Sequence, residues 1–506
     1  MVNMQANSDP WEQVAQRLGT DLFLDLQPDP SASARGRGAR LRRSLAAALR
    51  AAIDDGRLPA GTRLPPYRSL AADVGLARGT VSAVYQELIA EGWLVARQGS
   101  GTRVAAKARR PASRPADSAR PPTAVPTPAH DFALGQPNPS LFPRTDWVAS
   151  TRRAIMAAPD EAFGPGHPQG SAPLRRSLAA YLSRARGVQA DPEQIVLTTS
   201  VMHALELLSR NVFDGPLAVE SHGLPFHRAV IERAGTATTP VAIDAGGAII
   251  GELAADACGV LLTPSHQFPT GVPLSPTRRA EVIDWARAGR RLIVEDDYDG
   301  ELRYDREPIG ALQSLGPDVV IHTGSVSKSL SPAVRIAWLV LPPHLVDTVA
   351  RSKGIREPDA SIVDQLVLAD LIDSGAYDRH IRRSRQYYRR RRDRLTARLA
   401  EAGLGLPGIA AGLHAVIPIP AALEPIIARA AERRGFALAP LGLFRHPAAP
   451  VPAVGGGDPA GSRTGGIVVG FGTPAASTFA ADVDALVALI TDHLVATEVA
   501  AERANR

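Results

Sequence analysis

The sequence holds a single cysteine, Cys258, among its 506 residues. One cysteine excludes an internal disulfide framework and a metal site built from several cysteines, and we predict no metal site. The chain has no apolar run of the roughly 20 residues that cross a bilayer. Residues 1–9 are polar where a secretory signal peptide has an apolar centre. These absences predict a cytoplasmic protein that neither spans a membrane nor is secreted.

Lysine is absent from residues 35–104, although this stretch is strongly basic. It holds 12 arginines and 5 acidic residues, a formal charge of +7, and residues 105–130 add +4. The whole chain carries +6, so about −5 remains for the rest. A basic module on an acidic body indicates binding to nucleic acid or another polyanion. A length of 506 residues with 45% hydrophobic content predicts two or more domains.

Residues 35–104 have the pattern of three helices followed by a hairpin. The predicted helices span residues 41–53, 69–74 and 78–90. The inward positions of the third helix are Val81, Val84, Tyr85 and Leu88. Two short predicted strands, residues 93–96 and 102–104, enclose a glycine-containing turn. This order of elements predicts a winged helix-turn-helix.

The geometry of that motif predicts its contacts with DNA. The third helix enters the major groove with its amino end first, which places Arg78 and Thr80 against base edges or phosphates. Arg63 and Arg68, near the second helix, are expected to bind phosphates. The wing, residues 97–103, is expected to reach the adjacent minor groove. The predicted DNA contacts are therefore Arg63, Arg68, Arg78, Thr80, Arg97, Ser100 and Thr102.

The remaining chain divides into three parts. Residues 1–34 have little pattern and form an N-terminal extension, and residues 105–130 contain six prolines, which predicts an extended linker. In residues 131–506, apolar strand-like runs alternate with helical segments. This alternation predicts an α/β domain with a mainly parallel sheet. The clearest strand-like runs are residues 195–198, 217–219, 259–262, 292–294 and 319–321.

Functional side chains follow two of these predicted strands. Asp296, Asp297 and Tyr298 come after residues 292–294, and Lys328 comes after residues 319–321. Ligand groups gather at the carboxyl ends of strands in parallel sheets. A lysine amine, a carboxylate for a pyridine nitrogen, a tyrosine hydroxyl and anion-binding side chains are what pyridoxal phosphate (PLP) requires. We therefore predict a PLP site around Lys328.

The motifs of residues 35–104 resemble the GntR-type winged helix. The resemblance rests on Arg63-Leu64-Pro65, on the helix at residues 78–85 and on the strings at residues 91–94 and 99–102. One departure is Ala77, which stands where this family usually has a serine. Alanine has no side-chain acceptor for a helix cap, so we expect a loss of about 1 kcal/mol in helix stability.

Residues 131–506 resemble a fold-type I aminotransferase. The strings at residues 263–271 and 295–299, TPSHQFPTG and EDDYD, carry this resemblance. A winged helix followed by such a domain is the arrangement of MocR/PdxR-type transcription regulators. The resemblance implies the PLP-dependent transferase fold type I, with a large α/β subdomain and a smaller C-terminal one. It also implies a head-to-tail homodimer in which each body carries its partner's winged helix.

The same resemblance implies roles for individual residues. Lys328 forms the internal aldimine with PLP, Asp296 pairs with the pyridine nitrogen, and Tyr298 meets the ring oxygen. Asp297 is the competing candidate for the pyridine nitrogen, because adjacent strand residues point to opposite faces. The implied phosphate ligands and further cofactor contact are Ser325, Ser327, Arg335 and His266.

Several positions depart from the aminotransferase pattern. Val201 and Met202 replace polar residues of the expected phosphate cup. Leu224 stands where the family often has a tyrosine that stacks on the ring, so this stacking is either lost or supplied by His222 or Phe226. Residues 466–470 form a strand-like run without the arginine that grips a substrate carboxylate in related transaminases. Arg463 is the remaining candidate for that task. These departures predict a remodelled effector pocket.

Three hypotheses follow. The first is a PLP-responsive regulator that senses PLP or an amine or amino acid and binds double-stranded operator DNA. The second is an active aminotransferase with an accessory DNA-binding domain, and the third is a regulator whose PLP site has decayed. A dense arginine cluster on a predicted helix is either a solvated face or a second contact with DNA or a partner. Its members are Arg382, Arg383, Arg385, Arg389, Arg390, Arg391, Arg392 and Arg394.

Overall fold

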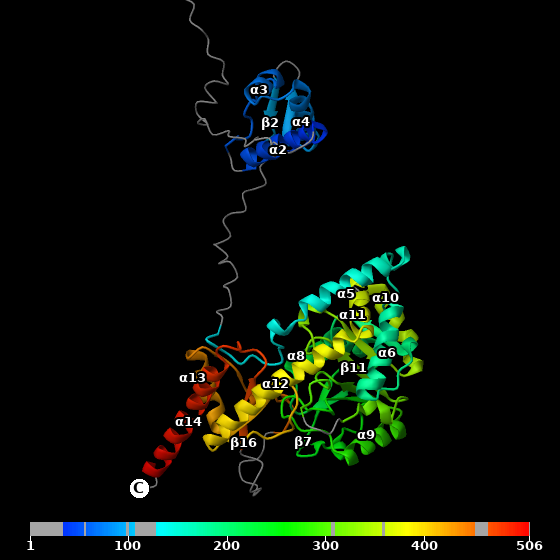
Figure 1. Ribbon diagram of the computed structural model, residues 1–506, viewed down its shortest axis with the longest axis vertical. Coiled ribbons are helices and arrows are strands. Elements are labelled where there is room, and N and C mark those ends of the chain that lie inside the picture. Colours follow the sequence, from blue (N-terminus) through cyan, green and yellow to red (C-terminus); the bar gives the residue numbers. More distant parts are fainter. Residues whose placement is uncertain are drawn as a thin grey trace, which may run out of the picture. The chain divides into compact units, whose positions relative to one another are not determined.

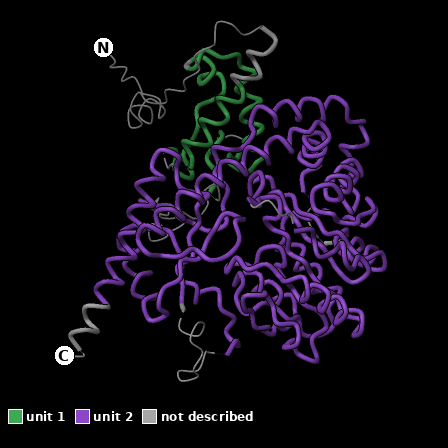
Figure 2. Tube along the Cα trace, turned by 60° about the horizontal axis from the view of Figure 1, so that its bottom comes forward, with its two compact units in different colours: residues 1–126 green, residues 127–506 purple. Residues whose placement is uncertain are grey.

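The computed structural model describes residues 34–54, 57–97, 101–106, 128–304, 309–356, 360–450 and 464–504. It divides into two compact units, residues 1–126 and residues 127–506 (Figures 1 and 2). None of the described helices combines the length and apolarity that a membrane span requires. The predicted contacts Ser100 and Arg463, and most of the predicted extension and linker, lie outside the described residues.

The first unit is the predicted winged helix-turn-helix. It consists of α2 (Ala34–Asp54), α3 (Tyr67–Asp73), α4 (Arg78–Ala90), β1 (Leu94–Arg97) and β2 (Gly101–Val104). The strands pair antiparallel, with Leu94 opposite Val104. Leu45 and Leu49 of α2 pack in one core with the inward residues of α4. The four inward residues of α4 are those that the sequence predicts, Val81, Val84, Tyr85 and Leu88.

The start of α4 lacks a side-chain cap, as its sequence predicts. Ala77 is the N-cap residue and no side chain accepts a hydrogen bond from the first turn. The helix is held instead by its neighbours. Tyr85 donates a buried hydrogen bond to the carbonyl of Pro65 at 3.0 Å, and Arg50 of α2 binds Glu87 and Glu91 at 2.9 and 2.7 Å. These contacts fix α4 against α2 and the connector before α3.

The second unit is built on a seven-stranded sheet. Its strand order is β4 (Ile195–Thr198), β12 (Ala337–Val340), β11 (Val320–Ser325), β10 (Leu292–Asp296), β9 (Gly259–Leu262), β5 (Leu217–Glu220) and β6 (Thr238–Val241). All neighbours are parallel except β12, which is antiparallel to both β4 and β11. The mainly parallel sheet is therefore confirmed. A separate short hairpin pairs β7 (Ile243–Asp244) with β8 (Gly247–Ala248).

Helices cover both faces of this sheet and complete the large subdomain (Figure 1). They are α5 (Arg144–Ala157), α6 (Ala172–Arg186), α7 (Val201–Asn211), α8 (Pro225–Arg233), α9 (Pro276–Gly289), α10 (Pro343–Arg356) and α11 (Ile362–Asp373). Alternation along the strands decides which face each residue joins. Val196 of β4 lies in one apolar cluster with α7 and α10, whereas Leu197 lies in another with α6 and α11.

A small subdomain follows at the C-terminal end. Its sheet has the order β13 (His414–Pro420), β16 (Thr464–Gly470) and β15 (Ala439–Pro440). Its helices are α12 (Ala376–Glu401), α13 (Glu424–Arg433) and α14 (Phe479–Ala504). The segment that enters the unit contributes β3 (His130–Asp131), paired with β14 (Phe436–Ala437), and places Phe132 in this subdomain's core.

Candidate functional site

A cavity of about 560 Å³ opens where strands β10 and β11 of the large sheet end, facing the small subdomain. Its size is typical of small-molecule sites. Of the predicted cofactor residues, Lys328, Asp296, Tyr298, Ser325 and Ser327 line it. Arg335 and His266 do not line it. Arg335 is exposed and has a left-handed backbone (φ 58°), whereas His266 is buried behind Tyr298.

Lys328 lies in the cavity and is held by the segment that follows β3. Its ammonium donates a hydrogen bond to the carbonyl of Gly135. Burial lowers the pKa of Lys328, although Asp296 and Asp299 oppose this shift. Gly135 has φ +65°, and a Cβ at this position would lie 3.0 Å from Lys328 Nζ. A glycine is therefore required both by the backbone and by the approach of the lysine.

Asp296, the last residue of β10, and Asp297, which follows it, have different surroundings. Asp297 forms a bidentate ion pair with the buried Arg186, at 2.6 and 2.9 Å, and is not among the lining residues. Despite its burial, which acts in the opposite direction, the pKa of Asp297 is lowered because Arg186 stabilises the charge. Asp296 lines the cavity and has no such cation. Its burial, with the charges of Asp297 and Asp299, raises the pKa of Asp296 to about 7.

A second buried carboxylate lies at the end of β5. Glu220 accepts hydrogen bonds from Thr263 Oγ1 at 2.5 Å and from Gln267 Nε2 at 3.2 Å. Burial raises the pKa of Glu220 to about 7. Glu220 and Thr263 both line the cavity. The cavity is therefore rich in carboxyl groups whose ionisation is unfavourable without a bound cation.

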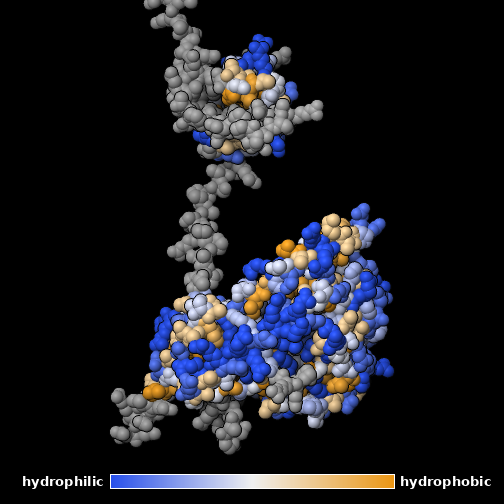
Figure 3. Space-filling model, viewed as in Figure 1, coloured by the Kyte–Doolittle hydropathy of each residue, from blue (hydrophilic) through white to orange (hydrophobic). Residues whose placement is uncertain are grey.

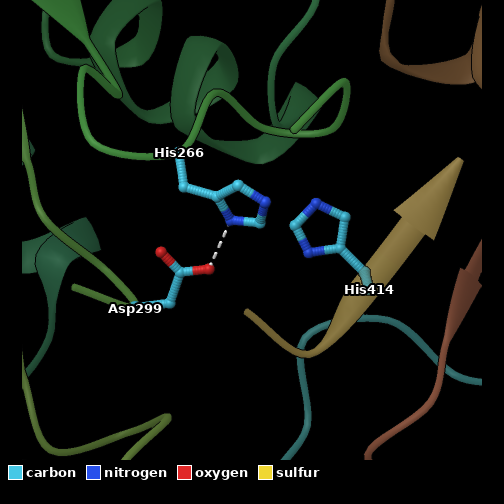
Figure 4. Close-up of side chains that lie close together, drawn as sticks. All are labelled: His266, Asp299 and His414. Atoms are coloured by element: carbon cyan, nitrogen blue, oxygen red, sulfur yellow. Dashed lines mark hydrogen bonds and ion pairs between the residues drawn. The ribbon is translucent and has the colours of Figure 1, made fainter. Parts of the chain in front are cut away.

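Tyr298 is positioned by a buried polar group. Its hydroxyl lies 3.0 Å from His266 Nδ1 and donates to the His266 carbonyl at 3.0 Å. His266 Nδ1 also lies 2.7 Å from Asp299 Oδ2. His414, the first residue of β13, projects toward this pair (Figure 4). Potential ligand atoms of His266, Asp299 and His414 lie within 4.8 Å of one another, so these side chains are of a type and spacing that metals use.

One end of the cavity suits an anion. Ser200 is the N-cap of α7, and its hydroxyl accepts from the His203 amide at 3.1 Å. Val201 and Met202 form the first turn of that helix and line the cavity, as does Ser200. First-turn amides of a helix have no partners within the helix and favour anions. Because the side chains of Val201 and Met202 offer no hydrogen bond, an anion here depends on backbone amides and serine hydroxyls.

Several lining residues were not predicted from the sequence. They include Gly135, Ser200, Glu220, His227, Arg228, Thr263, Phe268, His414 and Phe444. His227 is half-buried near Lys328, and burial lowers the pKa of His227 to about 4. The strand end at Glu220 was a usable signal, because it matches the strand end at Asp296. Gly135 and His414 carry no local signal, since they reach the cavity only through packing of the small subdomain.

The predicted DNA contacts lie on the winged helix-turn-helix. Arg63, Arg68 and Arg78 are exposed, and Thr80 and Thr102 are half-buried. Arg63 pairs with Arg103 through a β-bridge, which brings it beside the wing. None of Arg63, Arg68 and Arg78 forms an ion pair with a described residue, so these charges are available to a polyanion. Arg97 lies at the end of β1, where the wing begins.

The arginine cluster of α12 divides into two kinds of residue. Arg391 is buried, donates to the carbonyls of Phe471 and Gly472 at 3.0 Å, and stacks on Phe479. It is a packing residue of the small subdomain. Exposed members include Arg382, Arg390 and Arg394, and the face over α12 is hydrophilic (Figure 3).

Comparison with known proteins identifies both units. Residues 41–104 match the gntR family of bacterial regulatory proteins, and residues 130–432 match aminotransferase class I and II. A kynurenine aminotransferase structure from Pyrococcus horikoshii has a TM-score of 0.64 and 24% identity, covering 72% of this chain and 91% of its own. The fold is therefore that of a GntR-type winged helix followed by a fold-type I aminotransferase domain.

Curated regulators are similar to most of this chain. The HTH-type pyridoxine biosynthesis transcriptional regulator PdxR of Corynebacterium glutamicum is 33% identical, over 73% of this chain and 81% of its own. The "Probable rhizopine catabolism regulatory protein MocR" of Rhizobium meliloti is 31% identical, over 79% and 86%. The chain belongs to the MocR/PdxR-type family of HTH transcriptional regulators. It is a DNA-binding regulator with an aminotransferase-like domain, which confirms the resemblance drawn from the motifs.

The contrast between the two aspartates predicts opposite effects of removing their charges. The pKa of Asp296 is about 7 in the folded protein against an ordinary 3.8, so the folded state binds more protons than the unfolded chain between these values. Its contribution to stability is complete below about pH 4 and is lost as pH rises through about 7. In ligand-free protein, Asp296→Asn should therefore raise stability at pH 8 by about 2–4 kcal/mol and leave it nearly unchanged at pH 4.

Asp297→Asn is the matched control. It leaves Arg186 buried without its partner, so it should destabilise the protein at pH 8 by about 3–5 kcal/mol. Thermal unfolding of both variants and the parent, followed from pH 4 to 8, measures these differences. An Asp296→Asn variant that melts below the parent at pH 8 would contradict the assignment of an uncompensated carboxyl group.

Proposed function

We propose that this protein is a PLP-responsive transcription regulator. The second unit binds PLP, senses PLP or a small amine through it, and thereby changes how the winged helices bind a double-stranded operator. The observation that supports this most strongly is one lysine with a lowered pKa, in a cavity, beside a buried carboxyl group that forms no ion pair with a described arginine. Regulation follows if DNA binding by the first unit differs between the PLP-bound and the PLP-free state of the second unit.

The cavity residues fit this cofactor. Lys328 supplies the amine, and Asp296 is the group that would face the pyridine nitrogen, because Asp297 is held by Arg186. Tyr298, fixed by His266, would meet the ring oxygen. Ser200, Ser325, Ser327 and the first turn of α7 would hold the phosphate. PLP contributes an aldehyde that reacts reversibly with amines, together with an electron-withdrawing ring.

A sensing role is favoured over turnover by what the cavity lacks. Turnover of amino acids requires a firm grip on the carboxylate as well as a relay of protons. Residues 464–470 of β16 include no arginine, and the start of α7 offers apolar side chains to the phosphate. These features suit occupancy by a ligand more than repeated catalysis.

Lys328→Ala tests the cofactor assignment. The full-length protein titrated with PLP should show the visible absorption band of lysine-bound PLP, and this band should be absent from Lys328→Ala and from Lys328→Arg, which keeps the charge. Little PLP should bind to other lysines, because the chain has only three. One of them, Lys353, is buried and donates to the Pro168 carbonyl at 2.7 Å. A parent protein without the band would favour the decayed-site hypothesis, and multiple-turnover keto-acid production would favour the enzyme.

Arg78→Ala tests the DNA-binding assignment. Arg78 is exposed at the amino end of α4, so its loss should weaken operator binding by about 1–3 kcal/mol. Arg42→Ala is the control, because it removes one positive charge from the same unit, where Arg42 is paired with Glu87. Fluorescence anisotropy with operator DNA at fixed salt measures both. Equal affinities of the Arg78→Ala variant and the parent would exclude α4 as the recognition helix.

We also propose a homodimer. Helix α5 carries an exposed apolar stripe of Val148, Ile155 and Met156, with 68%, 40% and 81% of their surface exposed. Apolar stripes of this kind on a surface mark protein contacts. Sedimentation at micromolar concentration should show a dimer that Val148→Asp/Met156→Asp dissociates, whereas Val495→Asp, an exposed apolar position on α14, should not. A monomeric parent protein would contradict the proposal.

A further inference from the structure

Where its residues are described, the side of the cavity that the small subdomain forms is apolar except for one histidine. Its lining residues are Leu413, His414, Ala437, Leu438, Ala439, Leu443 and Phe444. Behind them, Val468 of β16 is completely buried and packs in one cluster with Phe268 and Phe444. A ligand that extends from Lys328 toward this subdomain therefore meets apolar surface.

The described residues of the cavity offer no cation that is available to a ligand carboxylate. Among the described residues that line the cavity, Arg228 is the only one besides Lys328 with a permanent positive charge. Its guanidinium already donates to the carbonyls of Gly223, Phe444 and Arg445, at 3.0, 3.2 and 3.3 Å. Because Phe444 and Arg445 belong to the small subdomain, these bonds join the two subdomains. If Arg228 bound a ligand carboxylate instead, these hydrogen bonds between the subdomains would be lost.

The acids of the same cavity favour a positively charged ligand. Glu220, Asp296 and Asp299 all line it, and none of the three forms an ion pair with a described arginine or lysine. Because burial raises the pKa of Glu220 and of Asp296 to about 7, a cation bound beside them stabilises their ionised forms. A ligand that brings an ammonium group gains this interaction, and one that brings a carboxylate does not.

His414 is the one polar side chain among the described residues of the apolar side. Its ring hydrogen-bonds the backbone of Pro269, but one ring nitrogen lacks a partner. Its side chain is 4% exposed, and Nε2 has no hydrogen-bond partner among the described residues. Burial and the charges of His266 and Lys328 keep the pKa of His414 well below its ordinary value, so the imidazole is neutral. A buried polar atom of this kind calls for a partner. A neutral imidazole suits a hydroxyl or amide group better than a carboxylate.

We propose that the small molecule recognised in this cavity is a primary amine with an apolar substituent and a neutral hydrogen-bonding group, which His414 Nε2 binds. An amino acid with a free carboxylate is the disfavoured ligand. The inference rests on the proposed PLP function, because the amine lies beside Lys328. Lys328 and the acids select the amine, the apolar side selects the substituent, and His414 selects the hydroxyl or amide.

Four commercial amines test this specificity in the full-length protein loaded with PLP. L-Phenylalaninol, 2-phenylethylamine and L-phenylalanine differ only in a hydroxymethyl group, a hydrogen or a carboxylate, and ethanolamine lacks the aromatic ring. Titrations followed by the visible spectrum and by calorimetry should give phenylalaninol the lowest midpoint. We expect it about tenfold below 2-phenylethylamine, the effect of one net hydrogen bond, and further below L-phenylalanine and ethanolamine.

Two variants separate recognition by His414 from a role in folding. His414→Leu keeps the volume and loses the hydrogen bond, so it should remove the preference for phenylalaninol and leave 2-phenylethylamine binding unchanged. His414→Gln retains a hydrogen-bonding group and should restore part of the preference. A purely structural histidine would change the binding of all four amines by the same factor, and that result would overturn the assignment of His414.

Two further outcomes distinguish a failure of the proposed ligand class from a failure of the proposed PLP function. If L-phenylalanine binds as tightly as phenylalaninol and Arg228→Gln abolishes that binding, Arg228 is the carboxylate site and the inference is wrong, while the PLP function stands. If the parent protein shows no lysine-bound band before any amine is added, the proposed function fails and the inference fails with it.

Discussion

The buried ion pair between Arg186 and Asp297 is the interaction on which the ligand cavity depends. Arg186 extends from α6 and binds both oxygens of Asp297, as well as Ser265 Oγ and the carbonyl of Ile309. Since adjacent strand residues point to opposite faces, holding Asp297 on the α6 side turns Asp296 into the cavity. The bidentate geometry is what compensates two charges that have lost their water. The reactive end of β10 is thus set by a residue outside the cavity.

The cavity belongs to two subdomains, and hydrogen bonds to backbone carbonyls hold them together. Arg228 of α8 reaches the carbonyls of Phe444 and Arg445, and Lys328 reaches that of Gly135, which follows directly on the segment that enters the small subdomain's core. Each of these donors is a lining residue. A ligand that reacts with Lys328 would break its hydrogen bond to Gly135, which is one of the contacts between the large and the small subdomain. Hinge and shear movements about ligands arise at contacts of this kind.

The sequence predicts correctly those strands and helices whose pattern is contained in their own residues. The strands β4 and β9 have the predicted bounds because each is a short, continuous apolar run, and α4 has its predicted bounds and inward face because its periodicity is undisturbed. It also placed Lys328, Asp296 and Tyr298 together, since strand ends converge at one edge of a parallel sheet. It did not reach Gly135 or His414, which are distant in sequence and meet Lys328 only through tertiary packing. His266 was expected in the cavity and lies one layer behind it, because its ring is used to hold Tyr298.

The near absence of lysine has a chemical meaning for a protein that would handle an aldehyde. Arginine keeps its proton at neutral pH and does not condense with aldehydes under ordinary conditions, so 54 of the 57 basic side chains are inert toward one. Lys353 is enclosed, and Lys328 is the amine whose lowered pKa makes it nucleophilic. The basic residues that would bind DNA are therefore almost all arginines, which do not react with an aldehyde. Of the two lysines in the described part of the chain, only Lys328 is then placed to react with the carbonyl of a small molecule in the cavity.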